Sequence, residues 1–191
     1  MKHLIKPFLL TSVLLVGAAA YAQSKATLPF VIYDEAGGKV PYIASGYMGN
    51  TGQISIADDS TEKPHSGKTC MKVQYKANDQ WGGVVWQSPA NDWGNAPGGY
   101  DLTGAKKLTF WARGEKGGEE VTFSFGLIGA DKPYHDKAKG DTGKVKLTTD
   151  WKQYEIDLKD KDMSSVKTGF CWVVGGQGQP LNFYLDDIKF E

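Results

Sequence analysis

Cysteine, arginine and histidine are scarce in this sequence, and their scarcity excludes several kinds of enzyme. The 191 residues include two cysteines, three histidines and a single arginine, Arg113. A polysaccharide lyase built on a β-sandwich needs an arginine, a tyrosine and a histidine on one sheet, whereas His65 and His135 lie in predicted loops. No G-x-S-x-G or H-E-x-x-H motif occurs, so neither a serine nucleophile nor a zinc hydrolase site is indicated.

Long hydrophobic runs are also missing, apart from one at the N-terminus. There Lys2 and Lys6 precede "FLLTSVLLVGAAA", which ends in an A-x-A pattern. The run is too short for a membrane span and has the organisation of a secretory signal peptide, so we expect cleavage after Ala22. The mature chain, residues 23–191, is then a secreted or periplasmic protein of one domain with no transmembrane segment.

A concentrated positive charge is absent as well. The chain has 22 basic and 22 acidic residues, and loss of the signal peptide leaves 20 basic against 22 acidic residues. Binding to a phosphate backbone needs a basic patch, so we exclude nucleic acid as a partner.

Glycine and aromatic residues are abundant instead, with 24 glycines, nine tyrosines, eight phenylalanines and six tryptophans. Short runs of alternating polarity, bounded by Gly, Pro, Asn or Asp, predict an all-β sandwich. The eight runs from Lys68 onward fit a jelly roll of two antiparallel sheets. In it the first, eighth, third and sixth runs form one sheet, and the second, seventh, fourth and fifth form the other. The N-terminal "VIYDE" is expected at the edge of the first sheet.

This arrangement places Cys70 and Cys171 on opposite sheets. An even pair of cysteines in an oxidising compartment favours a disulfide, but the separation of two sheets exceeds the usual reach of one unless both side chains point inward. Two independent buried residues are the alternative.

Alternation within two runs gives more detail. In "EVTFSFGLI", one face is expected to be core and consists of Val121, Phe123, Phe125 and Leu127. The opposite face, of Thr122, Ser124 and Gly126, is expected to be a shallow trough on the outside of the sheet. In "NFYLDDIKFE", Asp186 falls on the same face as Tyr184, Ile188 and Phe190, where a carboxylate must be protonated, paired or bound to a metal.

Three stretches resemble the galactose-binding-like jelly-roll carbohydrate-binding modules that accompany bacterial glycoside hydrolases. They are "HSGKTCMKVQY", "GGYDLTGAKKLTFWARG" and "WKQYEIDLKDKDMSSVKTGFCWVV" with "NFYLDDIKFE", in an order that spans most of His65 to Glu191. The resemblance implies a non-catalytic module that binds a polysaccharide or oligosaccharide, with a separate glycoside hydrolase as a further partner.

The same resemblance implies a structural calcium ion. The matching positions are Asp34 or Glu35, the turn at Gly67–Lys68, and Asp186 in the last strand. Hard oxygen ligands from both ends of the chain suit Ca²⁺. The alternative is that these acids accept hydrogen bonds from turn amides or pair with Lys68.

Sugar binding needs flat aromatic rings and side chains that bond hydroxyl groups. Trp111 and Trp151 match framework positions of the resembled fold and are expected to be structural, while Trp86 and Trp172 fit either the trough or the core. The expected ligand contacts are Trp81, Trp93, Tyr134, His135, Trp86, Asp79, Gln80 and Gln87, with Asn91, Asp92 and Gln177 as further hydroxyl partners.

Two rival functions are considered. Glu155 and Asp157 in "EIDLKD" share a strand face, but the strand is predicted to lie away from the trough, so paired-carboxylate glycosidase chemistry is disfavoured. A secreted envelope or adhesive protein that uses the sandwich for protein–protein interaction is the alternative, and a continuous apolar patch would favour it.

Overall fold

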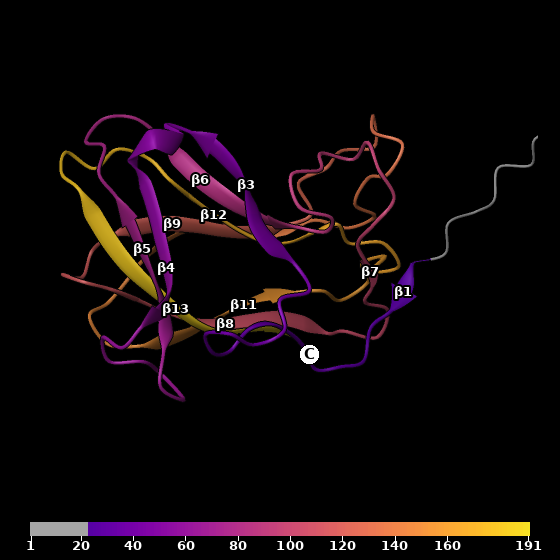
Figure 1. Ribbon diagram of the computed structural model, residues 1–191, viewed down its shortest axis with the longest axis horizontal. Coiled ribbons are helices and arrows are strands. Elements are labelled where there is room, and N and C mark those ends of the chain that lie inside the picture. The colour runs from indigo at the N-terminus through magenta and orange to yellow at the C-terminus, as the bar shows by residue number, and fades with distance from the viewer. Residues whose placement is uncertain (1–22) are drawn as a thin grey trace, which may run out of the picture.

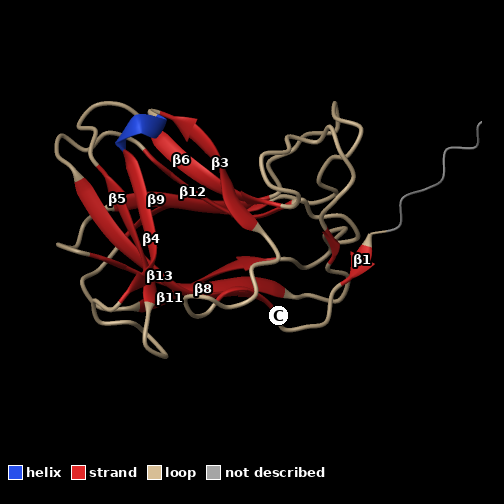
Figure 2. Ribbon diagram, viewed as in Figure 1, coloured by secondary structure: helices blue, strands red, loops and turns tan. Residues whose placement is uncertain are grey.

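The computed structural model describes residues 23–191, which form two antiparallel β-sheets packed face to face (Figures 1 and 2). The predicted signal peptide lies outside the described residues. Within them, no helix has the length and hydrophobicity needed to cross a lipid bilayer.

One sheet has the strand order β11-β8-β13-β5-β4, with β2 also paired to β13. Its strands are β2 (Phe30–Tyr33), β4 (Ile54–Ser60), β5 (Cys70–Tyr75), β8 (Lys107–Gly114), β11 (Lys152–Asp157) and β13 (Leu181–Phe190). We call it the six-stranded sheet. The predicted membership of this sheet is confirmed. β2 pairs with β13 alone, along the second half of that strand, so "VIYDE" lies at an edge of the sheet as expected. Beside the first half of β13, β5 is followed by β4 at the edge.

The other sheet has the order β10-β9-β12-β6-β3, and we call it the five-stranded sheet. It contains β3 (Ile43–Gly49), β6 (Gly82–Gln87), β9 (Glu120–Phe125), β10 (Gly140–Lys146) and β12 (Thr168–Val174). The predicted jelly-roll order is therefore confirmed for this sheet too. A short 3₁₀ turn, η1 (Thr51–Gln53), joins β3 to β4, and β1 (Ser24–Lys25) pairs with β7 (Tyr100–Asp101).

Alternate residues of the central strands fill the space between the sheets. Phe110 of β8, Phe123 of β9 and Phe170 of β12 meet there with ring centroids 4.6 to 5.9 Å apart. Burial of these rings drives the packing of the two sheets, because each ring removes a large apolar surface from water.

The two cysteines are not bonded to each other. Cys70 alternates with the inward-facing Met71 and Val73, and Cys171 alternates with the inward-facing Phe170 and Trp172. Both thiols therefore lie on the outer faces of their own sheets, with the core between them. The structure chooses the alternative of two independent buried cysteines.

The last strand departs from regular alternation. Phe183 and Leu185 face the core, and so do Ile188 and Phe190, because β13 has a bulge between Asp186 and Lys189 where Asp187 has a φ of 49°. An extra residue in one strand reverses the parity beyond it. The prediction that Asp186 shares a face with Ile188 and Phe190 is therefore wrong: Asp186 points away from the core.

Candidate functional site

The outer face of the five-stranded sheet carries small side chains at its centre. The strand register places Thr122 of β9, Val173 of β12 and Gly83 of β6 in one row across the sheet. A second row consists of Ser124, Cys171, Val85 and Gly46. Small side chains thus occupy the centre of this face, where Gly83, Val85 and Cys171 are buried. Met48 of β3 continues the first row beside Gly83. Gly126 and Leu127 follow the end of β9 and belong to neither of its faces. A trough on this face stays a prediction.

Trp81 stands at one end of this face. It directly precedes β6, and strand alternation puts position 81 on the same side as Gly83 and Val85. Its side chain is 52% exposed and lines an open depression together with the exposed Asp79 and Gln80. The Gln80 side chain also accepts a hydrogen bond from the Asn50 side chain. Three of the predicted ligand contacts thus lie together.

Trp93 and Tyr134 stand at the other end, on two loops that project beside one another in Figure 1. Trp93 belongs to the 88–99 loop, which follows β6, and Tyr134 belongs to the 126–139 loop, which follows β9. The Tyr134 N–H donates to Gly94 O at 3.1 Å, so the loops touch. His135, half-buried in the same loop, has its Nδ1 3.1 Å from Lys132 O.

The distance between these two ends follows from β6 itself. Gln87 is the sixth residue after Trp81, and at about 3.3 Å per residue these six steps span roughly 20 Å. Gln87 is on the outer side of β6, and its Nε2 donates to Asp92 O at 2.8 Å, which holds the 88–99 loop at that end of the strand. The aromatic residues therefore bracket the outer face along its length.

A buried lysine holds the loop end in place. Lys167, just before β12, is 1% exposed, and its Nζ lies 2.6 Å from Asp92 Oδ2. Burial opposes the charge of Asp92, but the hydrogen bonds from Lys167, Asn95 and Gly94 prevail and lower the pKa of this carboxyl. Sequence analysis did not select Lys167, although a lysine opening the apolar run "KTGFCWVV" was a signal for it.

Asp136 fixes the second loop to the same strand. Its Oδ1 accepts hydrogen bonds from Lys167 N and Thr168 N, and its Oδ2 accepts from Ile128 N and Thr168 Oγ1. Burial raises the pKa of Asp136 even though these donors stabilise the charged form.

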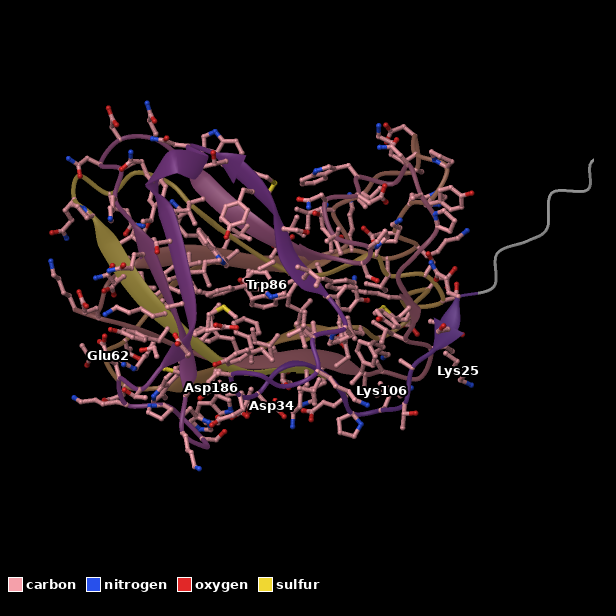
Figure 3. All side chains as sticks on the ribbon, in the orientation of Figure 1. Lys25, Asp34, Glu62, Trp86, Lys106 and Asp186 are labelled. Atoms are coloured by element: carbon pink, nitrogen blue, oxygen red, sulfur yellow. The ribbon has the colours of Figure 1, made fainter. Side chains whose placement is uncertain are left out.

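Two predicted ligand contacts are corrected by their positions. Trp86 is 3% exposed and packs edge-on against Phe170 between the sheets, as Figure 3 shows. Gln87 is fully buried, and its amide is occupied by Asp92 O and by Ser45 Oγ. Neighbouring valines made both faces of β6 look apolar in the sequence, so alternation alone did not place Trp86.

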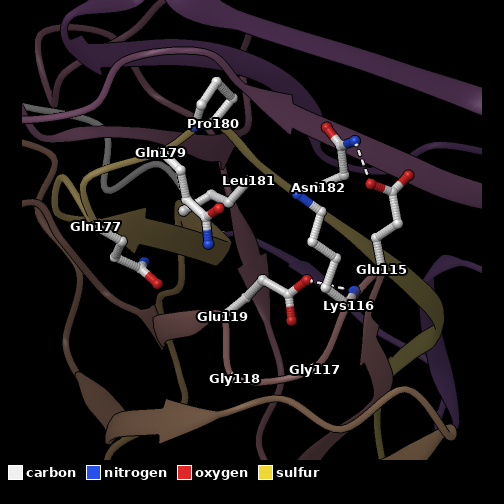
Figure 4. Close-up of a pocket in the computed structure, with 10 residues that line it drawn as sticks. All are labelled: Glu115, Lys116, Gly117, Gly118, Glu119, Gln177, Gln179, Pro180, Leu181 and Asn182. Carbon is white, nitrogen blue, oxygen red and sulfur yellow. Dashed lines mark hydrogen bonds between the residues drawn. The ribbon is translucent and has the colours of Figure 1, made fainter.

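Among the further hydroxyl partners, Gln177 bonds the backbone of Glu120 through both ends of its amide. It lines a pocket of ≈ 200 Å³ at the end of the sandwich, shown in Figure 4. There the buried Glu119 accepts a hydrogen bond from Lys116 N at 2.8 Å. This pocket is separate from the three exposed aromatic side chains.

The acidic residues expected around calcium gather at the 61–69 loop. Asp186 Oδ2 accepts from His65 N at 2.9 Å and from Ser66 N at 3.2 Å, and Glu35 accepts from Lys68 N and Thr69 N. Asp34, labelled in Figure 3, is exposed and directly follows Tyr33, which pairs with Ile188 of β13.

This donor arrangement does not fit a calcium centre as it stands. A cation needs oxygen lone pairs, and here backbone N–H groups already point at them; Lys68 in particular offers an N–H. No group of three or more His, Cys, Asp or Glu residues within 23–191 is placed to hold a metal ion. Calcium binding therefore stays a prediction.

The 61–69 loop also packs on the outer face of the six-stranded sheet. The His65 ring stacks on Trp111 at 3.8 Å, and Trp151 Nε1 donates to Lys63 O at 2.8 Å. Arg113 lies 3.6 Å over the Tyr184 ring and donates to Glu62 O. Trp111 and Trp151 thus have the structural roles expected of them. Arg113 is structural too, because it stacks on a tyrosine ring and bonds a backbone carbonyl.

Comparisons with known proteins agree with this architecture. The family 30 carbohydrate-binding module of a cellulosomal cellulase from Clostridium thermocellum superposes with a TM-score of 0.62. It is 19% identical, and the match covers 86% of this chain and 98% of that module. The family 11 module of another C. thermocellum cellulosomal cellulase gives a TM-score of 0.58 at 16% identity, covering 87% and 95%. These similarities show the sandwich fold.

A family 11 module from C. thermocellum in complex with a β-1,3-1,4-mixed-linked tetrasaccharide gives a TM-score of 0.53 at 16% identity, covering 86% of this chain and 96% of that module. The search of curated protein sequences found no match. The family model described as carbohydrate binding domain 30 matches residues 30–191, which is most of the chain and all thirteen strands but the first. The chain therefore belongs to the family of carbohydrate binding domain 30.

Proposed function

We propose that this protein binds a polysaccharide across the outer face of its five-stranded sheet and catalyses no reaction. One observation carries the proposal: three of the exposed large hydrophobic residues, Trp81, Trp93 and Tyr134, bracket a face of small side chains in a member of a carbohydrate-binding family. Aromatic rings stack on the C–H faces of sugars, and the exposed Asp79 and Gln80 offer hydrogen bonds to hydroxyl groups.

The test is depletion of residues 23–191 from solution by a panel of soluble and insoluble polysaccharides. We expect one glycan class to deplete the protein selectively, and Trp81→Ala, Trp93→Ala and Tyr134→Ala each to weaken that binding about tenfold, the equivalent of one lost contact of roughly 1.4 kcal/mol. Tyr47→Ala is the matched control. Tyr47 is 42% exposed, but it pairs with the inward-facing Val84 and lines a groove that contains none of the three aromatic residues of the proposed site.

Two results would count against the proposal. One is the absence of depletion by any glycan. The other is an equal loss of binding in Tyr47→Ala, because a uniform effect would report general surface adhesion and not a site between the two aromatic ends.

Export belongs to the same proposal. We infer that the protein is secreted, that cleavage follows Ala22, and that the bound polysaccharide is presented to a separate glycoside hydrolase. The organisation of residues 1–22 supports export. Mass spectrometry of the exported protein is expected to give an N-terminus at Gln23; an uncleaved chain would contradict it.

A structural calcium held by Asp34 or Glu35, the turn at Gly67–Lys68 and Asp186 is a further prediction from the resemblance. To bind the ion, Glu35 and Asp186 would exchange backbone N–H partners for it, so the 61–69 loop would rearrange. Thermal unfolding in calcium and in excess chelator decides the matter. A higher Tm in calcium supports the ion, by linkage of binding to folding. Identical Tm values leave the amides as the partners.

One observation favours the alternative of an envelope or adhesive protein. Val40, Ile43 and Tyr47 are 53%, 45% and 42% exposed, and they border an apolar groove where the edges of the two sheets meet. An uncharged edge strand is prone to pair with another chain. Sedimentation of the wild type and of Ile43→Lys separates the two functions: glycan binding by a monomer supports our proposal, and self-association abolished by Ile43→Lys supports the alternative.

A further inference from the structure

Lys167 makes three contacts with the loops that carry Trp93 and Tyr134. Its Nζ pairs with Asp92 Oδ2 at 2.6 Å, donates to Ala96 O, and lies 5.7 Å from the centre of the Tyr134 ring. No other charged side chain within residues 23–191 is so deeply buried except Asp186. One ammonium group thus contacts both loops at the same end of the outer face.

Burial of a lysine works against folding unless the charge is paired and hydrogen-bonded. An apolar side chain of similar volume fills such a position at lower cost. The sandwich core is apolar and does not need this ammonium. The partners of the Lys167 ammonium group lie on the 88–99 and 126–139 loops. We therefore attribute the buried charge to the positioning of these loops.

Trp93 is held on both sides by this network. The preceding residue, Asp92, accepts hydrogen bonds from Gly94 N, Asn95 N and Ala96 N, all at 3.0 Å, and its second oxygen also receives Lys167. The following residue, Gly94, accepts from Tyr134 N and has a φ of 86°. A Cβ on Gly94 would lie 2.6 Å from Ile128 Cγ2, so the backbone there is pressed against the neighbouring loop.

We propose that Lys167 is the positioning residue of the glycan site. It holds the 88–99 loop that carries Trp93, and the ring of Tyr134, in place before the glycan binds. The inference rests on the proposed function. A binding surface that is already ordered loses less entropy on association, so its affinity is higher. Trp81 has no contact with Lys167 and stands at the opposite end, so its contribution is independent of this network.

The test compares Lys167→Met with Lys39→Met. Methionine retains most of the alkyl chain and removes the charge, and Lys39 is an exposed loop residue with no ion pair. The first readout needs no glycan. In ¹⁵N relaxation of the tryptophan indoles, we expect the order parameter of Trp93 to fall in Lys167→Met, with Trp81 unchanged and neither changed in Lys39→Met.

The second readout is a pair of double-mutant cycles against the glycan that depletes the wild type. We expect Lys167→Met to weaken binding about tenfold. In the Lys167→Met protein, Trp93→Ala should reduce glycan affinity much less than it does in the wild type. Trp81→Ala should reduce glycan affinity by the same factor in both proteins. A general loosening of the fold would change both tryptophan factors together.

The outcomes separate this inference from the proposed function. Absence of glycan binding by the wild type overturns the proposed function and with it the role in binding. Retained binding with an unchanged Trp93 order parameter, or with additive cycles, overturns the inference alone. If Lys167→Met fails to fold, Asp92→Asn removes the same ion pair with less change of shape. If neither variant folds, the contact serves the fold itself and the inference is wrong.

Discussion

Asp186 is a buried carboxylate whose partners are backbone amides. Three N–H groups donate to it, from His65, Ser66 and Asp187. Burial nevertheless raises the pKa of Asp186 to about 6, with the charge of Asp187 adding to the effect. The alternation of the sequence indicated that this carboxylate needs a partner, and the structure supplies amides for it.

The raised pKa predicts a pH dependence. The folded state keeps the proton of Asp186 to a higher pH than the unfolded state, whose pKa is near 3.9, so this residue contributes less stability as the pH rises from about 4 through 6. In Asp186→Asn that loss is absent. We expect the wild type to lose about 2–3 kcal/mol of unfolding free energy relative to Asp186→Asn between pH 4 and pH 6.5.

Urea unfolding at several pH values measures the difference. Parallel pH profiles of the two proteins would show that Asp186 does not titrate in this range.

At the scale of elements, residues at the ends of strands determine where the loops begin and how they are attached to the sheet. β9 ends at Phe125 because Gly126 turns the chain with a φ of 75°, and a Cβ there would lie 2.0 Å from Ala138 O. Gly126 N also donates to Thr168 O at 2.9 Å, which ties the 126–139 loop to β12.

Two glycine substitutions separate strain from steric overlap. Gly126→Ala introduces both, and we expect it to lower the unfolding free energy by about 3 kcal/mol or more. Gly143→Ala in β10 has a similar φ of 64° but no atom within 4 Å of the new Cβ, so we expect a loss of about 1 kcal/mol. Chemical denaturation measures both, and equal losses would mean that the chain moves away from Ala138 freely.

The strand predictions succeeded where alternation is regular and failed at irregularities. The eight runs from Lys68 were assigned to the correct sheets, because their number and order fit a jelly roll. Within regular runs the apolar period of two marks the core face. The bulge at Asp187 reversed the alternation of β13, and nothing in local polarity announces an extra residue. Trp86 was misplaced for a related reason, since both faces of β6 are buried and apolar.

At the scale of the whole molecule, the two outer faces differ. The 61–69 loop packs on the outer face of the six-stranded sheet, where the His65 ring stacks on Trp111 and meets Trp151 edge-on. The five-stranded sheet leaves its face of small side chains between Trp81 and the paired loops. The six-stranded sheet thus serves as a scaffold, and the exposed aromatic residues flank the outer face of the five-stranded sheet.

The separation of the outer faces predicts the behaviour of the thiols. Burial raises the pKa of Cys70 to about 11 and that of Cys171 to about 12, so neither is reactive near neutral pH. We expect a chromogenic disulfide reagent to label no thiol in the native protein at pH 8 and two thiols in denaturant without reductant. One labelled thiol or none after unfolding would contradict the structure, and so would a Tm lowered by reductant.

The sequence by itself determined the sandwich, the membership of its sheets, the small residues of one outer face and the exposure of three aromatic side chains. These features follow from local periodicity, from the number and order of the runs, and from loops too polar to cover a ring. Only the tertiary structure decided the partners of Asp186, the burial of Trp86 and Gln87, and the role of Lys167. Each of these depends on residues distant in the chain, such as Asp92 and Lys167, whose contact arises when two loops meet over one strand. The pattern of polar and apolar residues does not reveal such contacts, because a buried lysine and a solvent-exposed lysine look the same in the sequence.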